Sequence, residues 1–275
     1  MALLTTMGPS RRQIAARSGE QQPRMSISRH SLEELISANR ILAHEGVVDA
    51  FGHVSIRHPE APDRYLMSRA RAPECIEIDD FIEFTLDGAP VEAIAPGRKP
   101  YAERFIHGAI YEARPEAMAV VHHHSPSVIP FGITGTKLSP VMHMCASMGT
   151  DVPTWDSRTN FGDTNLLVTT MAMARDLARA LGDRPVALMR GHGAVVAGGS
   201  LREVIFNSVY LELNATLQMQ ASSLGGEITF LSAGEVAAVL KTRSSFTYER
   251  AWEYWCRRAG RPYDSRPMEG PLAGN

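Results

Sequence analysis

The chain has 275 residues, of which 44% are hydrophobic and 21% charged, and its 28 Lys and Arg nearly balance 30 Asp and Glu. This composition is typical of a soluble globular protein and excludes disordered, collagen-like and coiled-coil classes. A net charge of −2 without a nucleic-acid-binding motif argues against a nucleic-acid partner. The unusual feature is the set of ten histidines, because six of them lie between His107 and His192.

Three segments are predicted along the chain. Residues 1–28 mix Arg, Gln, Ser and Gly without a continuous apolar stretch, so we expect a flexible tail rather than a secretory signal or a membrane span, with Met25 as an alternative start. Residues 29–225 are expected to form one α/β catalytic domain, and residues 226–275 a helical C-terminal extension that could pack on a neighbouring subunit. Three cysteines without a CxxC pair predict reduced thiols and a cytoplasmic protein.

Local patterns predict the order of the helices and strands. Ser31 and Glu34 form a capping box, which predicts a helix that begins at Ser31 and is closed by Gly46. Short apolar runs then predict several strands of one sheet between residues 50 and 87. The remaining elements are expected as a helix at 101–114, a strand at 117–124, a helix at 165–182, a strand at 185–190, a turn at 190–193, a long helix at 201–220 and two C-terminal helices near 232–241 and 245–260.

The strongest local signal is the run VVHHHS at residues 120–125. Side chains alternate between the two faces of a strand, so His122 and His124 are expected on one side and His123 on the other. Two imidazoles at this spacing can hold a metal ion at two points. The same pattern is also compatible with histidines whose hydrogen bonds are satisfied in the core or at the surface.

Further ligands are available at the ends of other predicted elements. His192 follows a strand in an Arg-Gly-His-Gly turn, where the glycines let the backbone bend sharply. Glu103 lies in the first turn of a predicted helix and could bind a metal or act as an acid or base, although the helix dipole alone would also stabilise a carboxylate there. His107, four residues later, is a competing ligand. Three histidines and one carboxylate would suit Zn²⁺, Mn²⁺ or Co²⁺ with an open position for a substrate.

Together these motifs resemble those of the class II aldolase/adducin family. The segments AERFIHGAIY at 102–111, AVVHHHSP at 119–126 and RGHGAVVAGGSLREV at 190–204 are similar to the family's helix-start Glu, its His-x-His strand end and its later Gly-His-Gly turn. The resemblance covers residues 30–220. It implies an α/β, class II aldolase-like three-layer fold with a central, mostly antiparallel sheet flanked by helices, assembled as a tetramer with active sites at subunit contacts.

The resemblance also implies how the histidines divide. The implied metal ligands are Glu103, His122, His124 and His192. By the same resemblance His107 and His123 are not ligands. Adducin head domains share the fold but lack the ligands, so the presence of all four favours an enzyme.

The chain departs from the sugar-phosphate aldolases of this family at their phosphate-binding motifs. GHVS at 52–55 stands for a Gly-Asn-x-Ser strand start, SRA at 68–70 for a Ser-Gly turn, and YA at 101–102 for a Ser-Ser pair. A guanidinium group can bind a carboxylate with two hydrogen bonds, so the expected substrate is a small carboxylate rather than a phosphorylated sugar. The substrate-binding candidates are His53, Ser68, Arg69 and Arg71.

These departures resemble the decarboxylase branch of the family, which acts on hydroxylated aromatic or ring-cleaved dicarboxylates. The resemblance implies a carbon–carbon lyase of aromatic catabolism, with 3,4-dihydroxyphthalate as the first candidate substrate and a divalent metal as the electron sink. Glu103 or a tyrosine would protonate the product, and Tyr210, Tyr248 and Tyr254 are candidates that could equally pack in the core. Two alternatives stay open: a class II aldolase that cleaves a non-phosphorylated hydroxy-keto acid, and a non-catalytic adducin-like assembly module.

Overall fold

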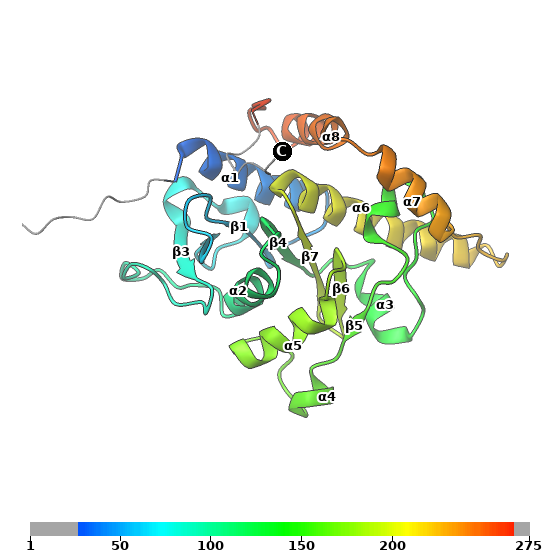
Figure 1. Cartoon of the computed structure of the whole chain (residues 1–275), viewed down its shortest axis with the longest axis horizontal. Helices are drawn as coiled ribbons and strands as arrows, with labels where there is room; N and C mark the ends of the chain where they lie inside the picture. The colour runs from blue at the N-terminus through cyan, green and yellow to red at the C-terminus, as the bar shows by residue number, and fades with distance from the viewer. Residues whose placement is uncertain (1–26, 267–275) are drawn as a thin grey trace, which may run out of the picture.

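The computed structural model describes residues 27–266, so the predictions for residues 1–26 and 267–275 lie outside it. A sheet of seven strands in the order β3-β2-β1-β4-β7-β6-β5 forms the centre of the molecule (Figure 1). All neighbouring strands are antiparallel except β5 and β6. The strands are β1 His53–Arg57, β2 Arg64–Ser68, β3 Phe81–Thr85, β4 Ala119–His123, β5 Thr154–Trp155, β6 Val186–Met189 and β7 Gly193–Gly198.

Helices cover both faces of this sheet, which gives the expected three layers. In Figure 1, α1, α6 and α8 lie above the sheet and α2 and α5 below it. The helices are α1 Arg29–His44, α2 Arg104–Ala113, α3 Ile129–Thr134, α4 Arg158–Phe161, α5 Met171–Leu181, α6 Leu201–Ser223, α7 Ala233–Thr242 and α8 Ser245–Arg258. Three short 3₁₀ helices are η1 Pro73–Cys75, η2 Ile78–Asp80 and η3 His143–Met148. Within the described chain, no helix is both long and apolar enough to span a membrane.

Each face of the sheet has its own hydrophobic core. Val121 and Val196 belong to the core shared with α1, α6 and α8. Val120 and Val195 belong to the core shared with α2 and α5. Because side chains alternate along a strand, His122 points to the same face as Val120, toward α2. The position of this histidine therefore follows directly from the apolar pattern of β4.

The predicted start of the first helix is wrong by two residues. Ser28 caps α1, because its hydroxyl accepts a hydrogen bond from the backbone N–H of Ser31. Glu34 is not a capping residue, and its buried carboxylate instead accepts hydrogen bonds from Arg202 on α6. The capping-box pattern was present by chance, and a distant arginine decided the role of Glu34.

The helix predicted at 165–182 is correct only in its second part. α5 begins at Met171, where Thr170 caps it by accepting a hydrogen bond from Met173 N–H. Residues 165–170 are not helical, and Leu166 has a positive φ of 67°. A second correction concerns GAVVAG at 193–198, for which the sequence patterns predict no element and which forms the strand β7 between β4 and β6.

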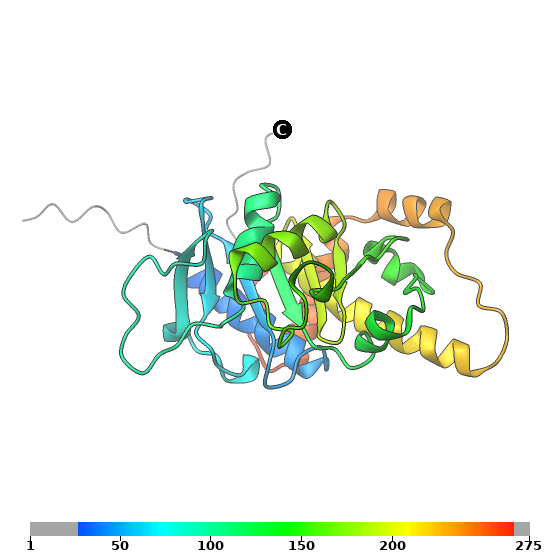
Figure 2. The same cartoon turned by 90° about the horizontal axis from the view of Figure 1, so that it is seen from below.

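The C-terminal helices differ in how they pack. Trp252 and Cys256 on α8 are fully buried in the same core as α1 and α6. The C-terminal half of α6 and the segment that leads to α7 instead project beyond the sheet (Figure 2). Leu224, in this projecting part, is 86% exposed.

Candidate metal centre

His122 and His124 come from the end of β4, as the alternation of side chains predicts. Their Nε2 atoms are 3.0 Å apart. His122 is fully buried and lies opposite His53 in the pairing of β4 with β1. His123 points to the other face of the sheet, where it is also fully buried. The strand geometry therefore brings two of the three consecutive histidines together and separates the third.

His192 reaches the same place from the turn between β6 and β7. Gly191 has a φ of 65°, a left-handed conformation that glycine adopts at little cost. At Gly193, a Cβ atom would lie 2.1 Å from the carbonyl oxygen of His123, so only glycine allows β7 to approach β4 this closely. The two glycines thus have separate roles on either side of His192: one makes the turn and the other permits the strand pairing.

Glu103 approaches from the opposite side, at the N-cap of α2. One carboxylate oxygen, Oε1, accepts a hydrogen bond of 2.9 Å from the backbone N–H of Val168. The other, Oε2, lies 3.7 Å from Nε2 of His122 and 3.6 Å from Nε2 of His192. The backbone of the non-helical segment 165–170 therefore orients the carboxylate toward the histidines.

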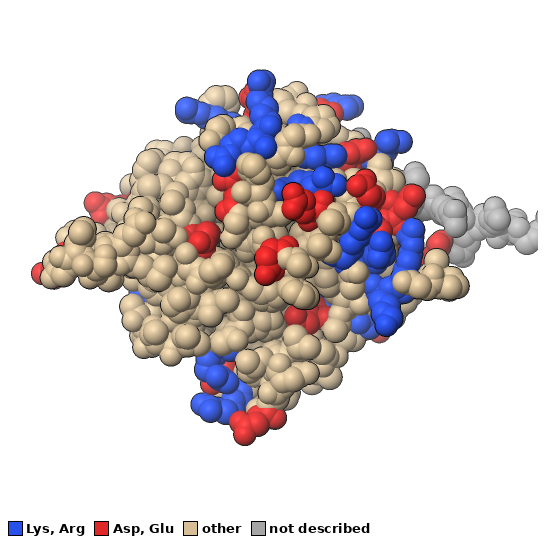
Figure 3. All heavy atoms as spheres, turned by 180° about the vertical axis from the view of Figure 1, so that it is seen from behind, with Lys and Arg blue, Asp and Glu red and all other residues tan. Residues whose placement is uncertain are grey.

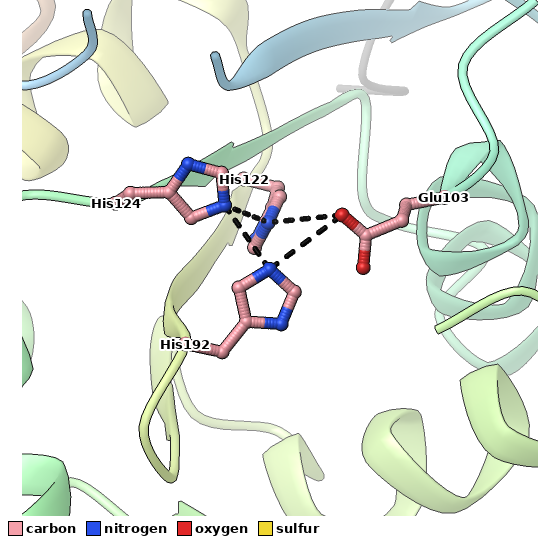
Figure 4. A group of neighbouring side chains, drawn as sticks. All are labelled: Glu103, His122, His124 and His192. Carbon is pink, nitrogen blue, oxygen red and sulfur yellow. Dashed lines mark hydrogen bonds and ion pairs between the residues drawn. The ribbon is translucent and has the colours of Figure 1, made fainter. Parts of the chain in front are cut away.

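The four side chains converge on one point (Figure 4). One donor atom from each of Glu103, His122, His124 and His192 lies within 4.8 Å of all the others. Nε2 of His124 is 3.1 Å from Nε2 of His192. Three nitrogens bound to one tetrahedral zinc ion at about 2.0–2.1 Å would be roughly 3.3 Å apart, so the observed spacing is close to that of a metal site.

The hydrogen bonds of the imidazoles show that this arrangement suits a cation. Nδ1 of His122 lies 3.1 Å from the carbonyl oxygen of Ala194, and Nδ1 of His192 lies 3.0 Å from that of Leu166. A carbonyl only accepts, so each ring carries a proton on Nδ1, and the neutral form of each ring directs an Nε2 lone pair into the cluster. Burial, followed by the neighbouring histidines, holds the pKa of His122 well below its usual range. Neutral imidazoles with converging lone pairs are the form that binds a divalent metal.

Of the substrate-binding candidates, His53 lies on β1 opposite His122, whereas Ser68, Arg69 and Arg71 lie at the end of β2, on the side of β1 away from β4. Arg69 and Arg71 both bind Asp80, with Arg69 Nε 2.5 Å from Oδ1 and Arg71 Nη1 2.6 Å from Oδ2. Asp80 is buried, and burial opposes a decrease in its pKa, but hydrogen bonds from Glu77 N–H and the two arginines lower it. Two guanidinium groups against one carboxylate leave one positive charge at this place.

Tyr101 connects these residues to the histidines, and the sequence singled it out only as a departure from a phosphate motif. Its hydroxyl donates a hydrogen bond to the carbonyl oxygen of Arg71. Burial raises the pKa of the Tyr101 phenol. Hydrogen bonds with the Arg71 backbone and the Ser68 side chain oppose this rise. The Tyr101 ring lies 4.6 Å from that of His53, between centroids. His53 in turn lies 5.0 Å from His122.

The three tyrosines considered as proton donors lie elsewhere in the chain. Tyr210 and Tyr248 pack against Phe206 in the α6 and α8 layer. Tyr254 is on the exposed side of α8 and binds Arg258. These positions are on the face of the sheet opposite to α2, so within one chain they do not approach the four converging side chains.

Comparison with known proteins shows the family of this chain. The family model described as Class II Aldolase and Adducin N-terminal domain matches residues 33–219. Decarboxylase tropJ from Talaromyces stipitatus is 35% identical over 245 residues, which cover 81% of this chain and 91% of that protein. The 3,4-dihydroxyphthalate decarboxylase from Arthrobacter keyseri is 30% identical over 235 residues, with the same coverage of 81% and 91%.

Solved structures show the same fold. The L-fuculose 1-phosphate aldolase from Glaciozyma antarctica PI12 superimposes with a TM-score of 0.67 at 24% identity, over 88% of this chain and 97% of that one. The class II aldolase-like fold expected from the sequence motifs is thereby confirmed. The chain belongs to the class II aldolase/adducin family.

Proposed function

We propose that this protein is a metal-dependent decarboxylase of hydroxylated aromatic dicarboxylates, with 3,4-dihydroxyphthalate as the first candidate substrate. The observation that carries the proposal is the convergence of three imidazole side chains and one carboxylate on a single point. The proposed metal ligands are Glu103, His122, His124 and His192. Such a donor set suits Zn²⁺, Mn²⁺ or Co²⁺.

A bound divalent cation would stabilise the negative charge that develops on substrate oxygens when the carbon–carbon bond breaks. The protein groups have other tasks. The backbone N–H of Val168 and the carbonyl of Leu166 hold Glu103 and His192 in orientation. Loss of CO₂ leaves a carbanion that must take up one proton, and we propose that Glu103 passes this proton from water to that carbon, because its Oε2 faces the cluster.

The charge around Asp80 supports a carboxylate substrate. Arg69 binds Asp80 through Nε, and within residues 27–266 both terminal nitrogens of its guanidinium group are left for a second anion. We propose that Arg69 binds a substrate carboxylate, with Arg71 and Ser68 supporting the turn and His53 contacting the substrate from β1. The names of the two curated relatives, both decarboxylases, favour this reaction over an aldol cleavage.

A class II aldolase that acts on a non-phosphorylated hydroxy-keto acid is the second candidate. It is favoured by the structural similarity to a fuculose-phosphate aldolase and would need the same four donors. Incubation of the metal-loaded protein with 3,4-dihydroxyphthalate and with hydroxy-keto acids separates the two reactions. We expect CO₂ from the dicarboxylate; aldehyde release from a keto acid without any CO₂ would contradict the proposal.

The metal requirement is tested with His192→Ala. We expect this variant to lose both the bound metal and the decarboxylase activity, because it removes one of the converging donors. His143→Ala is the matched control, since His143 is exposed on η3 and outside the cluster. Metal content by mass spectrometry and CO₂ release are measured on the same samples. Full activity in a His192→Ala protein shown to be free of metal would overturn the scheme and would indicate a reaction that needs no metal.

A further inference from the structure

A chain of buried hydrogen bonds runs between β1 and α2 and ends beside the metal ligands. The hydroxyl of Tyr111 lies 2.8 Å from Oγ of Ser55. Ser55 Oγ lies 2.6 Å from Nδ1 of His107, and Nε2 of His107 lies 2.7 Å from Nδ1 of His53. All four side chains are buried.

The regular geometry of the two elements creates this chain. His53 and Ser55 are two residues apart on a strand, which separates them by about 6.8 Å on one face. His107 and Tyr111 are four residues apart on a helix, which separates them by about 6 Å on one face. Two rows of polar groups with nearly equal spacing therefore face each other and can alternate in one line. Glu103 continues the helical row one turn earlier, at the cluster.

The direction of the hydrogen bonds is set at the end farthest from the cluster. Burial raises the pKa of the Tyr111 phenol, so the phenol keeps its proton and must donate it. Ser55 is the acceptor available to it among the described residues. The Ser55 proton then goes to Nδ1 of His107, which leaves the His107 proton on Nε2, where it is donated to Nδ1 of His53. In the opposite direction the phenolic proton would have no acceptor.

A neutral His53 ring can then carry its own proton only on Nε2. No hydrogen bond to this atom is formed within residues 27–266, and the atom is not among the buried polar atoms without a partner. The His53 ring lies between Tyr101 and His122, at 4.6 and 5.0 Å between centroids. The Nε2–H group is therefore a free donor next to the proposed metal ligands.

We propose that Tyr111, Ser55 and His107 are positioning residues that fix His53 in its Nε2–H form, so that His53 donates a hydrogen bond to a carboxylate oxygen of the substrate. The identity of this ligand rests on the proposed function, whereas the form of His53 does not. A neutral donor at this place contacts an anionic oxygen and cannot remove a proton from the substrate.

Neutron diffraction from deuterated crystals of the zinc-loaded protein tests the form of His53 directly. We expect deuterium on Nε2 of both His53 and His107 and none on Nδ1 of either ring. Deuterium on Nδ1 of His53 would overturn the proposal. This result does not depend on any assay of activity.

The effect on substrate binding is tested with Tyr111→Phe against the matched control Tyr65→Phe. Both phenols are buried in the same core, but the Tyr65 hydroxyl donates to the carbonyl oxygen of Arg104 and takes no part in the chain. We expect KM for 3,4-dihydroxyphthalate to rise about tenfold in Tyr111→Phe, the effect of one hydrogen bond, with unchanged metal content. We expect no rise in Tyr65→Phe.

The two experiments separate the failure of each proposal. Equal KM values in the two variants, or a KM rise that accompanies loss of metal, would contradict a positioning role. If the protein releases no CO₂ while neutron diffraction shows deuterium on Nε2 of His53, the proposed function fails and the assignment of the chain stands. If CO₂ is released but the deuterium is on Nδ1, the positioning proposal fails alone.

Discussion

At the scale of single residues, burial keeps several histidines of this chain neutral. His107 is fully buried, and burial lowers its pKa from the ordinary value to about 3. Burial likewise lowers the pKa of His123 to about 3. Buried imidazoles of this kind accept or donate hydrogen bonds as neutral rings. Histidine side chains thus have three roles in this chain: proposed metal ligand, member of the proposed hydrogen-bond chain, and core residue.

The low pKa of His107 predicts that acid destabilises the folded protein. A base whose folded pKa is about 3 and whose unfolded pKa is near 6.5 binds fewer protons in the folded state, so stability is full above pH 6.5 and is lost as the pH falls toward 3. Each such group contributes a slope of up to about 1.4 kcal/mol per pH unit in this range.

We therefore expect His107→Gln to be less stable than the parent at pH 8 and to lose less stability on acidification. Urea unfolding of the metal-free protein between pH 8 and pH 4.5 measures both free energies of unfolding. The difference between the two proteins should shrink steadily below pH 6.5. If the free energies of unfolding of the two proteins change in parallel from pH 8 to pH 4.5, the fold does not hold His107 neutral.

At the scale of elements, a buried ion pair connects α1, α6 and α8. Arg202 on α6 is 6% exposed, and its Nε and Nη2 atoms lie 3.1 and 2.9 Å from Oε2 of Glu34 on α1. Arg202 also donates to Glu249 on α8. Burial raises the pKa of Glu34, which the charge of Arg202 opposes. The attraction between Arg202 and Glu34 offsets the cost of burying both charges. The contact of Arg202 with Glu249 connects α8 to α6 and α1.

Removal of one partner should cost more than removal of both. We expect Arg202→Met to lower the free energy of unfolding by about 3–5 kcal/mol, because it leaves the Glu34 carboxylate buried without its counter-charge. The double variant Arg202→Met with Glu34→Leu should recover a large part of this loss.

Chemical denaturation of the parent, both single variants and the double variant gives the coupling energy. Arg257→Ala serves as the control for a surface pair, since Arg257 is 75% exposed and binds Glu253 one turn away. It should change stability by less than about 1 kcal/mol. A double variant as unstable as Arg202→Met would show that the other contacts of Arg202 dominate.

At the scale of the whole molecule, the C-terminal half of α6, residues 224–232 and α7 form a projecting arm with exposed apolar side chains. Figure 3 shows few charged side chains on the drawn face of this end, at the left of the view. Leu224 is 86% exposed, and Leu240 on α7 is 43% exposed. Exposed apolar groups gathered on one projection are typical of a subunit interface. We propose that this arm contributes to a homo-oligomer, for which the family resemblance suggests a tetramer.

The arm is tested with the double variant Leu224→Asp and Leu240→Asp. We expect the parent to behave as an oligomer in size-exclusion chromatography with light scattering, and the variant to have a smaller mass, because charges would be buried at the interface. Tyr254→Ser is the control, since Tyr254 is 55% exposed on α8, away from the arm. An unchanged mass in the double variant would place the interface elsewhere.

Much of the fold and of the site could be predicted from local patterns. The alternation of side chains in the segment 120–125 places His122 and His124 on one face of a strand. This alternation is a property of the extended backbone itself and does not depend on contacts with distant segments. The glycines around His192 likewise predicted a sharp turn. The sequence also showed that the phosphate-binding motifs are absent, which directs the proposals toward a carboxylate.

Other features depend on contacts between segments far apart in the sequence, and only the tertiary structure decided them. The segment 165–170 has a helical pattern but is held in an irregular, non-helical conformation, with its backbone bound to Glu103 and His192. Glu34 resembles a capping residue until Arg202, 168 positions later, makes it part of a buried pair. His53 acquires its partner from α2, 54 positions away. Local sequence determines which face a side chain takes on its own element; the partner it meets there depends on how the elements pack.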